Sequence, residues 1–413
     1  MSQGPAKGQR STASARASKL KVVTILRSCA KGLVLAGFLL GVASCLKDLP
    51  VLPPPAIVEY KFKLPPGKLA WPHLSPELTQ DEYEKSLDSI WIINNCGEFQ
   101  GGNNPADTAT EDDLHDGLDI VVSRKGTHLF AVEAGYVIGA SGGVVTISNK
   151  AEPSAIEAIE WVYVHVANYQ VRVGQQVSQG QYLADEAFDG LDHVHLMRRV
   201  AGQGWNALPY EADPTTFENL FEYRDTEPPI IDSVFYFFRN NSNDRIRSQP
   251  DGSMVLSGDI DIVVGMREVG EYAHSHDTRL GQFGDRLAVT GAKCCITGTG
   301  TQTIEDFGFD FRTLNFAPPP GKRIASTMYK PHWLLSSDSS WTKRFSYYVL
   351  SNFDGTKSTL LRNIDPNNCW RTTMVENSGA RRFPNGSYTI TVTAWDAAGN
   401  EASASTTVEV TNP

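Results

Sequence analysis

Short runs of β-branched and aromatic residues, separated by glycines, recur about every ten residues between Trp91 and Tyr210. The runs occupy residues 118–122, 127–131, 135–138, 144–147, 161–164 and 193–196. This spacing predicts the strands of a sandwich or barrel-like sheet. A good helix signal occurs only at residues 75–86, where Ser75 is an N-cap candidate and Pro76 suits the first helical position. The predicted fold class is all-β.

The later part of the chain also has strand patterns separated by turns. Pro228 and Pro229 precede a strand pattern at residues 231–238, and Asn385-Gly386 predicts a turn before residues 387–394, which alternate with a period of two. A second turn at 396–400 leads into residues 403–410. The stretch 385–400 resembles the last hairpin of bacterial immunoglobulin-like domains. We therefore expect residues 228–413 to form an immunoglobulin-like β-sandwich with an insertion.

The first 45 residues have the pattern of an export signal. Residues 1–31 contain seven lysines and arginines and no acidic residue, and residues 32–43 are uncharged and apolar but too few to span a bilayer. The sequence Val42-Ala43-Ser44-Cys45 resembles the lipobox of bacterial lipoproteins, in which Cys45 would be acylated. This predicts a signal peptide at 1–44 and a proline-rich tether at 45–74. The alternative is a plain signal peptide with a chance cysteine.

Charge and cysteine content agree with export. Removing the seven positive charges from the 37 in the chain leaves 30 against 47 acidic residues, a net charge of −17. Such a balance argues against a nucleic-acid partner. The exported part keeps Cys96, Cys294, Cys295 and Cys369, and we expect Cys369 to pair with Cys294 or Cys295, since all three lie in the later region.

Histidines and a carboxylate occur at strand spacing. His115 and Asp119 are four residues apart, and His193 and His195 are two apart, so each pair lies on one face of an extended strand. If the two strands are neighbours, the four side chains converge. Two histidines and one carboxylate form a three-ligand zinc site with an open fourth position, which is typical of catalytic zinc.

These motifs, in this order along the chain, resemble those of a known family. His115-x-Gly-x-Asp119, then Tyr163-x-His165, then His193-x-His195 resemble the lysostaphin-like (LytM-type) zinc metallopeptidases, which cut the peptide bridges or stems of bacterial peptidoglycan. Residues 126–127, 134–137 and 173–181 resemble further landmarks of that family. The likeness covers about residues 92–210, and we expect a peptidase domain with an antiparallel sheet at 75–222. One departure is that the usual HLHFE ending reads HVHLM here.

The resemblance implies a role for each residue. His115, Asp119 and His195 would bind one Zn²⁺, and His165 and His193 would be the catalytic pair. Zinc lowers the pKa of a bound water and polarises a scissile carbonyl. Because no glutamate stands beside the ligands, a histidine must act as the general base.

Together these features predict an exported, lipid-anchored, zinc-dependent endopeptidase that hydrolyses peptide crosslinks or stems of peptidoglycan. The anchor on Cys45 would hold it to a membrane, and Leu46 favours the outer membrane, facing the periplasm, in a Gram-negative cell. Residues 228–413 would position the enzyme or bind a cell-wall protein partner. Two alternatives stay open: a catalytically silent, peptidoglycan-binding activator of cell-wall amidases, and an adhesion or scaffold lipoprotein that acts through residues 228–413.

Overall fold

The structure is a computed structural model. It describes residues 58–95, 117–122, 127–152, 158–187, 193–200, 220–221, 226–268, 287–298, 303–311, 327–331, 334–335, 345–353 and 364–413. The predicted signal peptide, Cys45 and Cys96 lie outside these ranges. Within them, no helix is both long enough and apolar enough to cross a membrane.

The first group of elements lies between residues 69 and 221. It comprises β1 (Leu69–Ala70), α2 (Gln80–Leu87), β2 (Ile90–Asn94), β3 (Leu118–Val122), β4 (His128–Phe130), β5 (Gly135–Ser141), β6 (Val144–Ser148), β7 (Ile159–Val164), β8 (Val166–Ala167), β9 (Gln176–Val177), β10 (Tyr182–Glu186), β11 (His193–Val200) and β12 (Leu220–Phe221). Every strand predicted between residues 118 and 196 is present, with bounds shifted by a few residues.

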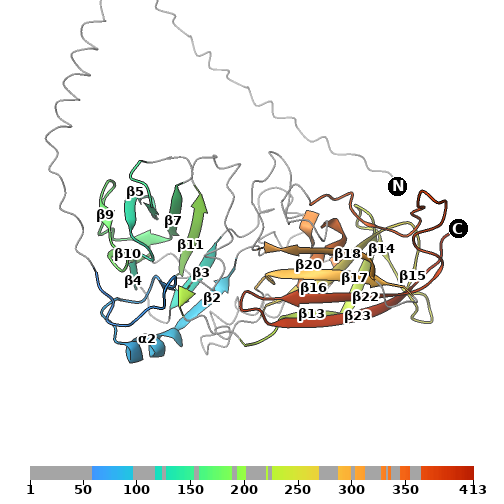
Figure 1. The fold of residues 1–413 in the computed structure, drawn as a ribbon, viewed down its shortest axis with the longest axis horizontal. Helices are drawn as coiled ribbons and strands as arrows, with labels where there is room; N and C mark the ends of the chain where they lie inside the picture. The colour runs from blue at the N-terminus through green and yellow to red at the C-terminus, as the bar shows by residue number, and fades with distance from the viewer. Residues whose placement is uncertain are drawn as a thin grey trace, which may run out of the picture. The chain divides into compact units, whose positions relative to one another are not determined.

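Seven of these strands form one antiparallel sheet in the order β2-β3-β11-β7-β6-β5-β9. Strands β4, β10 and β8 form a second antiparallel sheet, and β1 pairs with β12 in parallel. Figure 1 shows β7, β11 and β3 side by side in the large sheet. The sheet order therefore places the two motif-bearing strands, β3 and β11, next to each other.

Apolar side chains of both sheets and of α2 share one core. Tyr83 and Leu87 of the helix are buried in it, and so are Phe62, Trp71 and Leu74. Residues 62–74, which the sequence assigned to the tether, thus contribute to the packing of this region.

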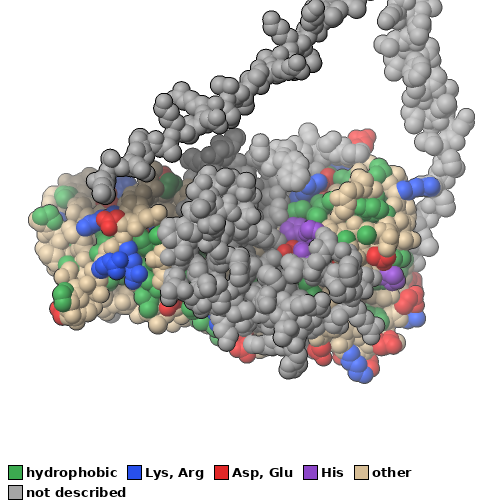
Figure 2. Space-filling model, turned by 180° about the vertical axis from the view of Figure 1, so that it is seen from behind, with side chains coloured by type: hydrophobic (Ala, Val, Ile, Leu, Met, Phe, Trp, Pro, Cys, Tyr) green, Lys and Arg blue, Asp and Glu red, His purple; other side chains and the backbone are tan. Residues whose placement is uncertain are grey.

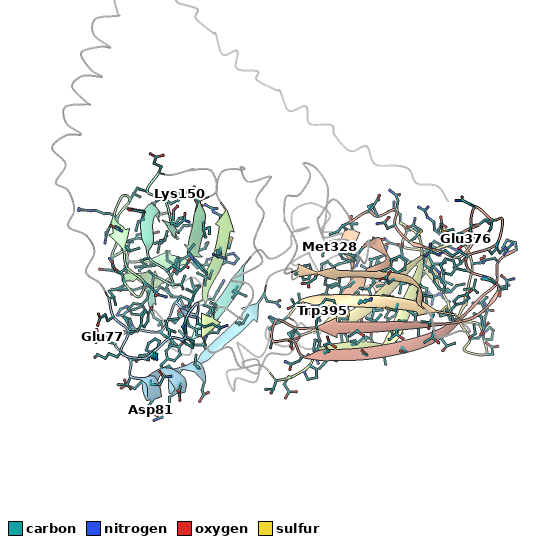
Figure 3. The ribbon with its side chains drawn as sticks, viewed as in Figure 1. Glu77, Asp81, Lys150, Met328, Glu376 and Trp395 are labelled. Carbon is teal, nitrogen blue, oxygen red and sulfur yellow. The ribbon has the colours of Figure 1, made fainter. Side chains whose placement is uncertain are left out.

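Helix α2 begins later than the sequence predicted. Its N-cap is Thr79 and not Ser75: the Thr79 hydroxyl accepts the backbone N–H of Glu82 at 3.4 Å, and the Glu82 carboxylate accepts the backbone N–H of Thr79 at 2.8 Å. This reciprocal capping box satisfies two backbone donors at once, whereas a proline at the first position satisfies none. Glu77 and Asp81 lie on the outer side of this segment and point into solvent (Figure 3).

The second group of elements lies between residues 230 and 410. It comprises β13 (Ile230–Arg239), β14 (Arg245–Ile246), β15 (Val255–Leu256), β16 (Asp259–Arg267), β17 (Gly291–Thr297), β18 (Thr303–Asp310), β19 (Tyr329–Lys330), β20 (Ser346–Val349), the 3-10 helix η7 (Leu350–Asn352), β21 (Trp370–Arg371), β22 (Gly386–Trp395) and β23 (Glu401–Val410). The strands predicted at 231–238, 387–394 and 403–410 are β13, β22 and β23.

Two sheets pack on one core in this region. The first has the order β14-β13-β16-β20-β19, with β21 also paired to β16, and the second has the order β15-β23-β22-β17-β18. Buried side chains of both sheets form a single cluster that includes Ile262, Cys294, Ile390 and Val408. The all-β prediction is confirmed, and this region is a two-sheet sandwich.

The cysteine prediction is wrong for the three described cysteines. Cys294, Cys295 and Cys369 are free thiols. Cys294 lies opposite Val392 within the second sheet, while Cys369 directly precedes β21, which pairs with β16 of the other sheet. The two chain segments therefore belong to opposite layers, which sequence proximity within one region could not reveal.

Candidate metal-binding active site

Strand pairing brings the motif residues together. Strand β11 lies between β3 and β7, and His195 on β11 stands directly opposite Asp119 on β3. On the other side of β11, His195 is opposite Val164, the last residue of β7. His193 is two residues before His195, so both imidazoles project from the same face of the strand. The sheet thus gathers one carboxylate and two imidazoles from two neighbouring strands.

A single carboxylate oxygen faces both imidazoles. The Nδ1 atom of His195 is 2.8 Å from Oδ1 of Asp119, which is a hydrogen-bond distance. The Nε2 atom of His193 is 3.7 Å from the same oxygen, beyond hydrogen-bond range. The three side chains are between 7 and 12% exposed. Their interactions are therefore little screened by water.

His165 lies beside this group at the end of β7. Its backbone φ of 61° is in the left-handed region, which is uncommon outside glycine. The turn is held from two sides, because the His165 carbonyl accepts the N–H of Ala187 at 2.7 Å and the Val166 N–H donates to the carbonyl of Gly143 at 3.0 Å. The ring centroids of His165 and His193 are 4.5 Å apart. The strained turn thus places a second imidazole against His193.

Gly117 has a steric reason to be glycine. A Cβ atom at this position would stand 2.6 Å from the carbonyl oxygen of Leu196 and 2.9 Å from Nε2 of His195. Both separations are shorter than van der Waals contact. The glycine of the His-x-Gly-x-Asp motif therefore lets β11 approach β3 closely enough for His195 to reach Asp119.

Of the five predicted site residues, the structure brings four together. His115, the fifth, lies outside the described residues. Within the part of the chain that is described, no group of three or more histidine, cysteine, aspartate or glutamate side chains is placed to hold a metal ion. Asp119 and His195 are two of the three predicted ligands, and His193 and His165 are the predicted catalytic pair.

The donor atoms of Asp119 and His195 suit zinc. A carboxylate oxygen and an imidazole nitrogen are common zinc ligands, with bonds of about 2.0–2.2 Å. Two such ligand atoms on a tetrahedral ion stand about 3.3 Å apart. The 2.8 Å between Nδ1 and Oδ1 would have to widen by about half an ångström, a change that small side-chain rotations provide. These residues therefore fit two positions of a zinc site.

The sequence did not single out a polar cluster around Asp185. One oxygen of this carboxylate is 2.6 Å from Nδ1 of His128 and also accepts the hydroxyl of Tyr182, while the other accepts the side-chain amide of Asn168 at 3.0 Å. Burial alone would raise the pKa of Asp185, but the hydrogen bonds from Tyr182, Asn168 and His128 lower it. Tyr182 is three residues from Asp185, but Asn168 and His128 are 17 and 57 residues away, and the set follows no motif that would have marked the cluster. On one face of the molecule, histidine side chains gather beside an acidic one (Figure 2).

Comparison with known proteins gives a limited result. No family model and no curated protein matches the chain. Similar solved structures include the catalytic domain of the antimicrobial peptidase lysostaphin from Staphylococcus simulans, with 21% identity over 29% of this chain and 88% of that one and a TM-score of 0.22. A zinc-containing peptidase from Vibrio cholerae has 20% identity over 26% of this chain and a TM-score of 0.21, and the chain spans 33% of that protein's length.

The SpoIIQ–SpoIIIAH pore-forming complex is similar at 19% identity over 32% of this chain and 86% of that one, with a TM-score of 0.23. The solved structures that resemble this chain thus include lysostaphin-type peptidases.

Proposed function

We propose that this chain is a zinc-dependent endopeptidase that hydrolyses peptide crosslinks or stem peptides of bacterial peptidoglycan. The observation that supports this most is the convergence of Asp119, His193 and His195 on two adjacent strands, with the His165 ring 4.5 Å from that of His193. In this proposal His115, Asp119 and His195 hold one zinc ion. His165 and His193 are the proton-carrying pair.

When bound, the zinc ion supplies Lewis-acid polarisation of the scissile carbonyl and lowers the pKa of water. The chain's own residues supply proton transfer and orientation. His193 and His165 present imidazole nitrogens side by side, so one can accept the proton of the attacking water and the other can donate a proton to the leaving amine. Asp119 orients the His195 ring, and the burial of Asp119, His193 and His195 keeps bulk water from competing for these protons.

Export and location belong to the same proposal and rest on the sequence. The lipobox-like residues 42–45 support a lipid anchor on Cys45 in the membrane, and Leu46 supports the outer membrane, facing the periplasm, of a Gram-negative cell. We further propose that residues 228–413 are an immunoglobulin-like module that positions the enzyme or binds a cell-wall protein.

A muropeptide profile tests the activity. Purified peptidoglycan is incubated with the zinc-loaded chain, with His193→Ala or His195→Ala, and with His128→Ala as a matched control, since the His128 side chain is 60% exposed and bonds Asp185 outside the proposed machinery. We expect new peptide ends with the wild type and the control and none with the other two variants. The position of the new ends identifies the bond that is cut.

If the wild type binds one zinc ion by elemental analysis but releases no peptide ends, the enzyme proposal is wrong. The same protein is then added to a cell-wall amidase. Faster amidase turnover would support the silent activator, which this arrangement of intact ligands and histidines does not favour.

A further inference from the structure

A buried carboxylate lies on the outer face of the first sandwich sheet. Along β16, Ile260, Ile262 and Val264 face the main core, so the alternation of the strand places Asp261 and Val263 on the opposite face. That face carries its own apolar cluster, formed by Tyr236, Phe238, Val263, Tyr347 and Val349 with Leu335 and Phe345 packed against it. Asp261 therefore lies among apolar side chains, with its own side chain 1% exposed.

Lys330 is the basic partner of this carboxyl group. The Nζ atom of Lys330, at the end of β19, lies 3.9 Å from Oδ2 of Asp261 and donates to the carbonyl of Ser242 at 2.7 Å. The same Nζ is 5.2 Å from the centroid of the Phe238 ring, and Phe238 stands opposite Asp261 across the β13–β16 pair. The Lys330 side chain is 11% exposed. The amine and the carboxyl thus face each other in an apolar pocket.

The two carboxyl oxygens of Asp261 have different surroundings. Oδ2 accepts the backbone N–H of Asn241 at 3.1 Å, and the φ of Asn241 is 51°, a left-handed conformation. Oδ1 is buried and has no hydrogen-bond partner among the described residues. An ionised carboxylate with a bare buried oxygen is costly. These surroundings favour the protonated carboxylic acid, with the proton on Oδ1 and with Oδ2 as the carbonyl oxygen.

Burial shifts both groups toward their neutral forms. Loss of solvation raises the pKa of Asp261 to about 7, against the opposing effects of Lys330 and the Asn241 N–H. Loss of solvation also lowers the pKa of Lys330, against the attraction of Asp261. A neutral amine is a nucleophile, and a carboxylic acid has a hydroxyl that can leave as water. Both shifts favour the neutral amine and the carboxylic acid, which are the two species that can condense.

We propose that Asp261 and Lys330 become joined by an amide bond between Cγ and Nζ, a covalent crosslink between β16 and β19. Nζ attacks Cγ, the Cγ–Oδ1 bond breaks, and one proton of the amine passes to the departing hydroxyl, so that one water is released and no oxidant or reductant is needed. The Asn241 N–H stabilises the charge that develops on Oδ2 during attack. Holding the reacting groups 3.9 Å apart in a fixed pocket replaces a bimolecular encounter.

The crosslink would tie two sequence-distant segments of the sandwich. A covalent closure of this kind stabilises a fold mainly by restricting the unfolded chain, as a disulfide does. It would also resist reducing agents, unlike a disulfide. The described cysteines of this region are free, so the amide would supply a covalent tie that these thiols do not.

Mass spectrometry of the purified full chain tests the proposal independently of any peptidase activity. After reduction and denaturation, we expect the wild type to weigh one water less than its sequence requires. Lys330→Arg and Asp261→Ala should have their full calculated masses. A digest of the wild type should contain a branched peptide that joins the segment with Asp261 to the segment with Lys330, and this peptide should be missing from both variants.

Two results would overturn the proposal. The first is a wild-type mass equal to that of the unmodified chain. The second is a loss of one water that persists in Lys330→Arg, which would assign the loss to a cyclic imide at an aspartate and not to a crosslink. Because the decisive measurement is made on the wild type, the proposal remains testable even if a variant folds poorly.

Discussion

His73 is enclosed in the core formed by the first group of elements, and its burial predicts a stability that falls in mild acid. Its side chain has no exposed surface, and neither ring nitrogen has a hydrogen-bond partner among the described residues. Nε2 is 4.0 Å from Oε2 of Glu186, too far for a hydrogen bond. Burial lowers the pKa of His73 to about 3. The folded protein therefore keeps this imidazole neutral at a pH where the unfolded chain protonates it.

The size of the effect follows from the two pKa values. The unfolded chain takes up a proton near the ordinary histidine pKa of about 6.5, and the folded chain does so only near 3. The stabilising contribution is therefore complete above the unfolded pKa and is lost as the pH falls from about 6.5 toward 3. The slope of the unfolding free energy against pH approaches about 1.4 kcal/mol per pH unit. Lowering the pH from 7 to 4.5 therefore costs about 2.5 kcal/mol of unfolding free energy through His73 alone.

Urea unfolding of the wild type and His73→Phe at several pH values between 7 and 4.5 measures this contribution. As the pH falls from 7 to 4.5, the unfolding free energy of the wild type should drop by about 2.5 kcal/mol more than that of His73→Phe, because only the wild type loses the His73 contribution. Leu74→Ala is the control: it removes a neighbouring buried side chain that does not titrate and should cost about 2–5 kcal/mol at every pH. Parallel curves for the wild type and His73→Phe would refute the reasoning, because they would mean that His73 has the same pKa in the folded and the unfolded chain.

Three further predictions concern the site and the helix. Gly117→Ala should lower peptidase activity at least about 10-fold with an unchanged circular dichroism spectrum, because the new Cβ displaces His195; full activity would contradict the close approach of the strands. Thr79→Ala should lower the urea unfolding free energy by about 1 kcal/mol, while Thr79→Ser, which keeps the hydroxyl that faces Glu82, should stay near wild type. Zinc at about 100 times its Kd should raise the wild-type unfolding free energy by about 2.7 kcal/mol. Asp119→Ala should show no such gain in a thermal shift assay, and an equal gain would exclude Asp119 as a ligand.

The strands that carry the site could be predicted because their residues have a clear local preference for the β conformation. The β-branched runs at 118–122 and 193–196 are buried strands, and the period of two places His193 and His195 on one face without knowledge of the fold. The pairing of His195 with Asp119 could be stated only as a condition, since register depends on which strands become neighbours. Here β3 and β11 are adjacent, and the condition is met.

The start of the helix and the buried contacts of His73 and Lys330 could not be predicted correctly from the local sequence. The N-cap prediction chose Ser75 because proline follows it, but the sequence Thr79-x-x-Glu82 offers two reciprocal hydrogen bonds and determines the helix start. The burial of His73 beside Glu186 joins residues with no meaningful spacing, so only tertiary packing could reveal it. The contact of Lys330 with Asp261 is of the same kind.

Asp119 and Asp261 show how neighbours decide what a buried carboxylate can do. Both lie on strands that are covered on both faces, and a sequence pattern treats them alike. Asp119 faces two imidazole nitrogens, and a carboxylate oxygen together with imidazole nitrogens is a donor set that suits zinc. Asp261 faces an amine beside an aromatic ring, where burial disfavours both charges and favours the neutral pair that can condense. The same side chain is thus suited to hold a metal ion in one sheet and to form a bond in another, because the residue opposite it differs.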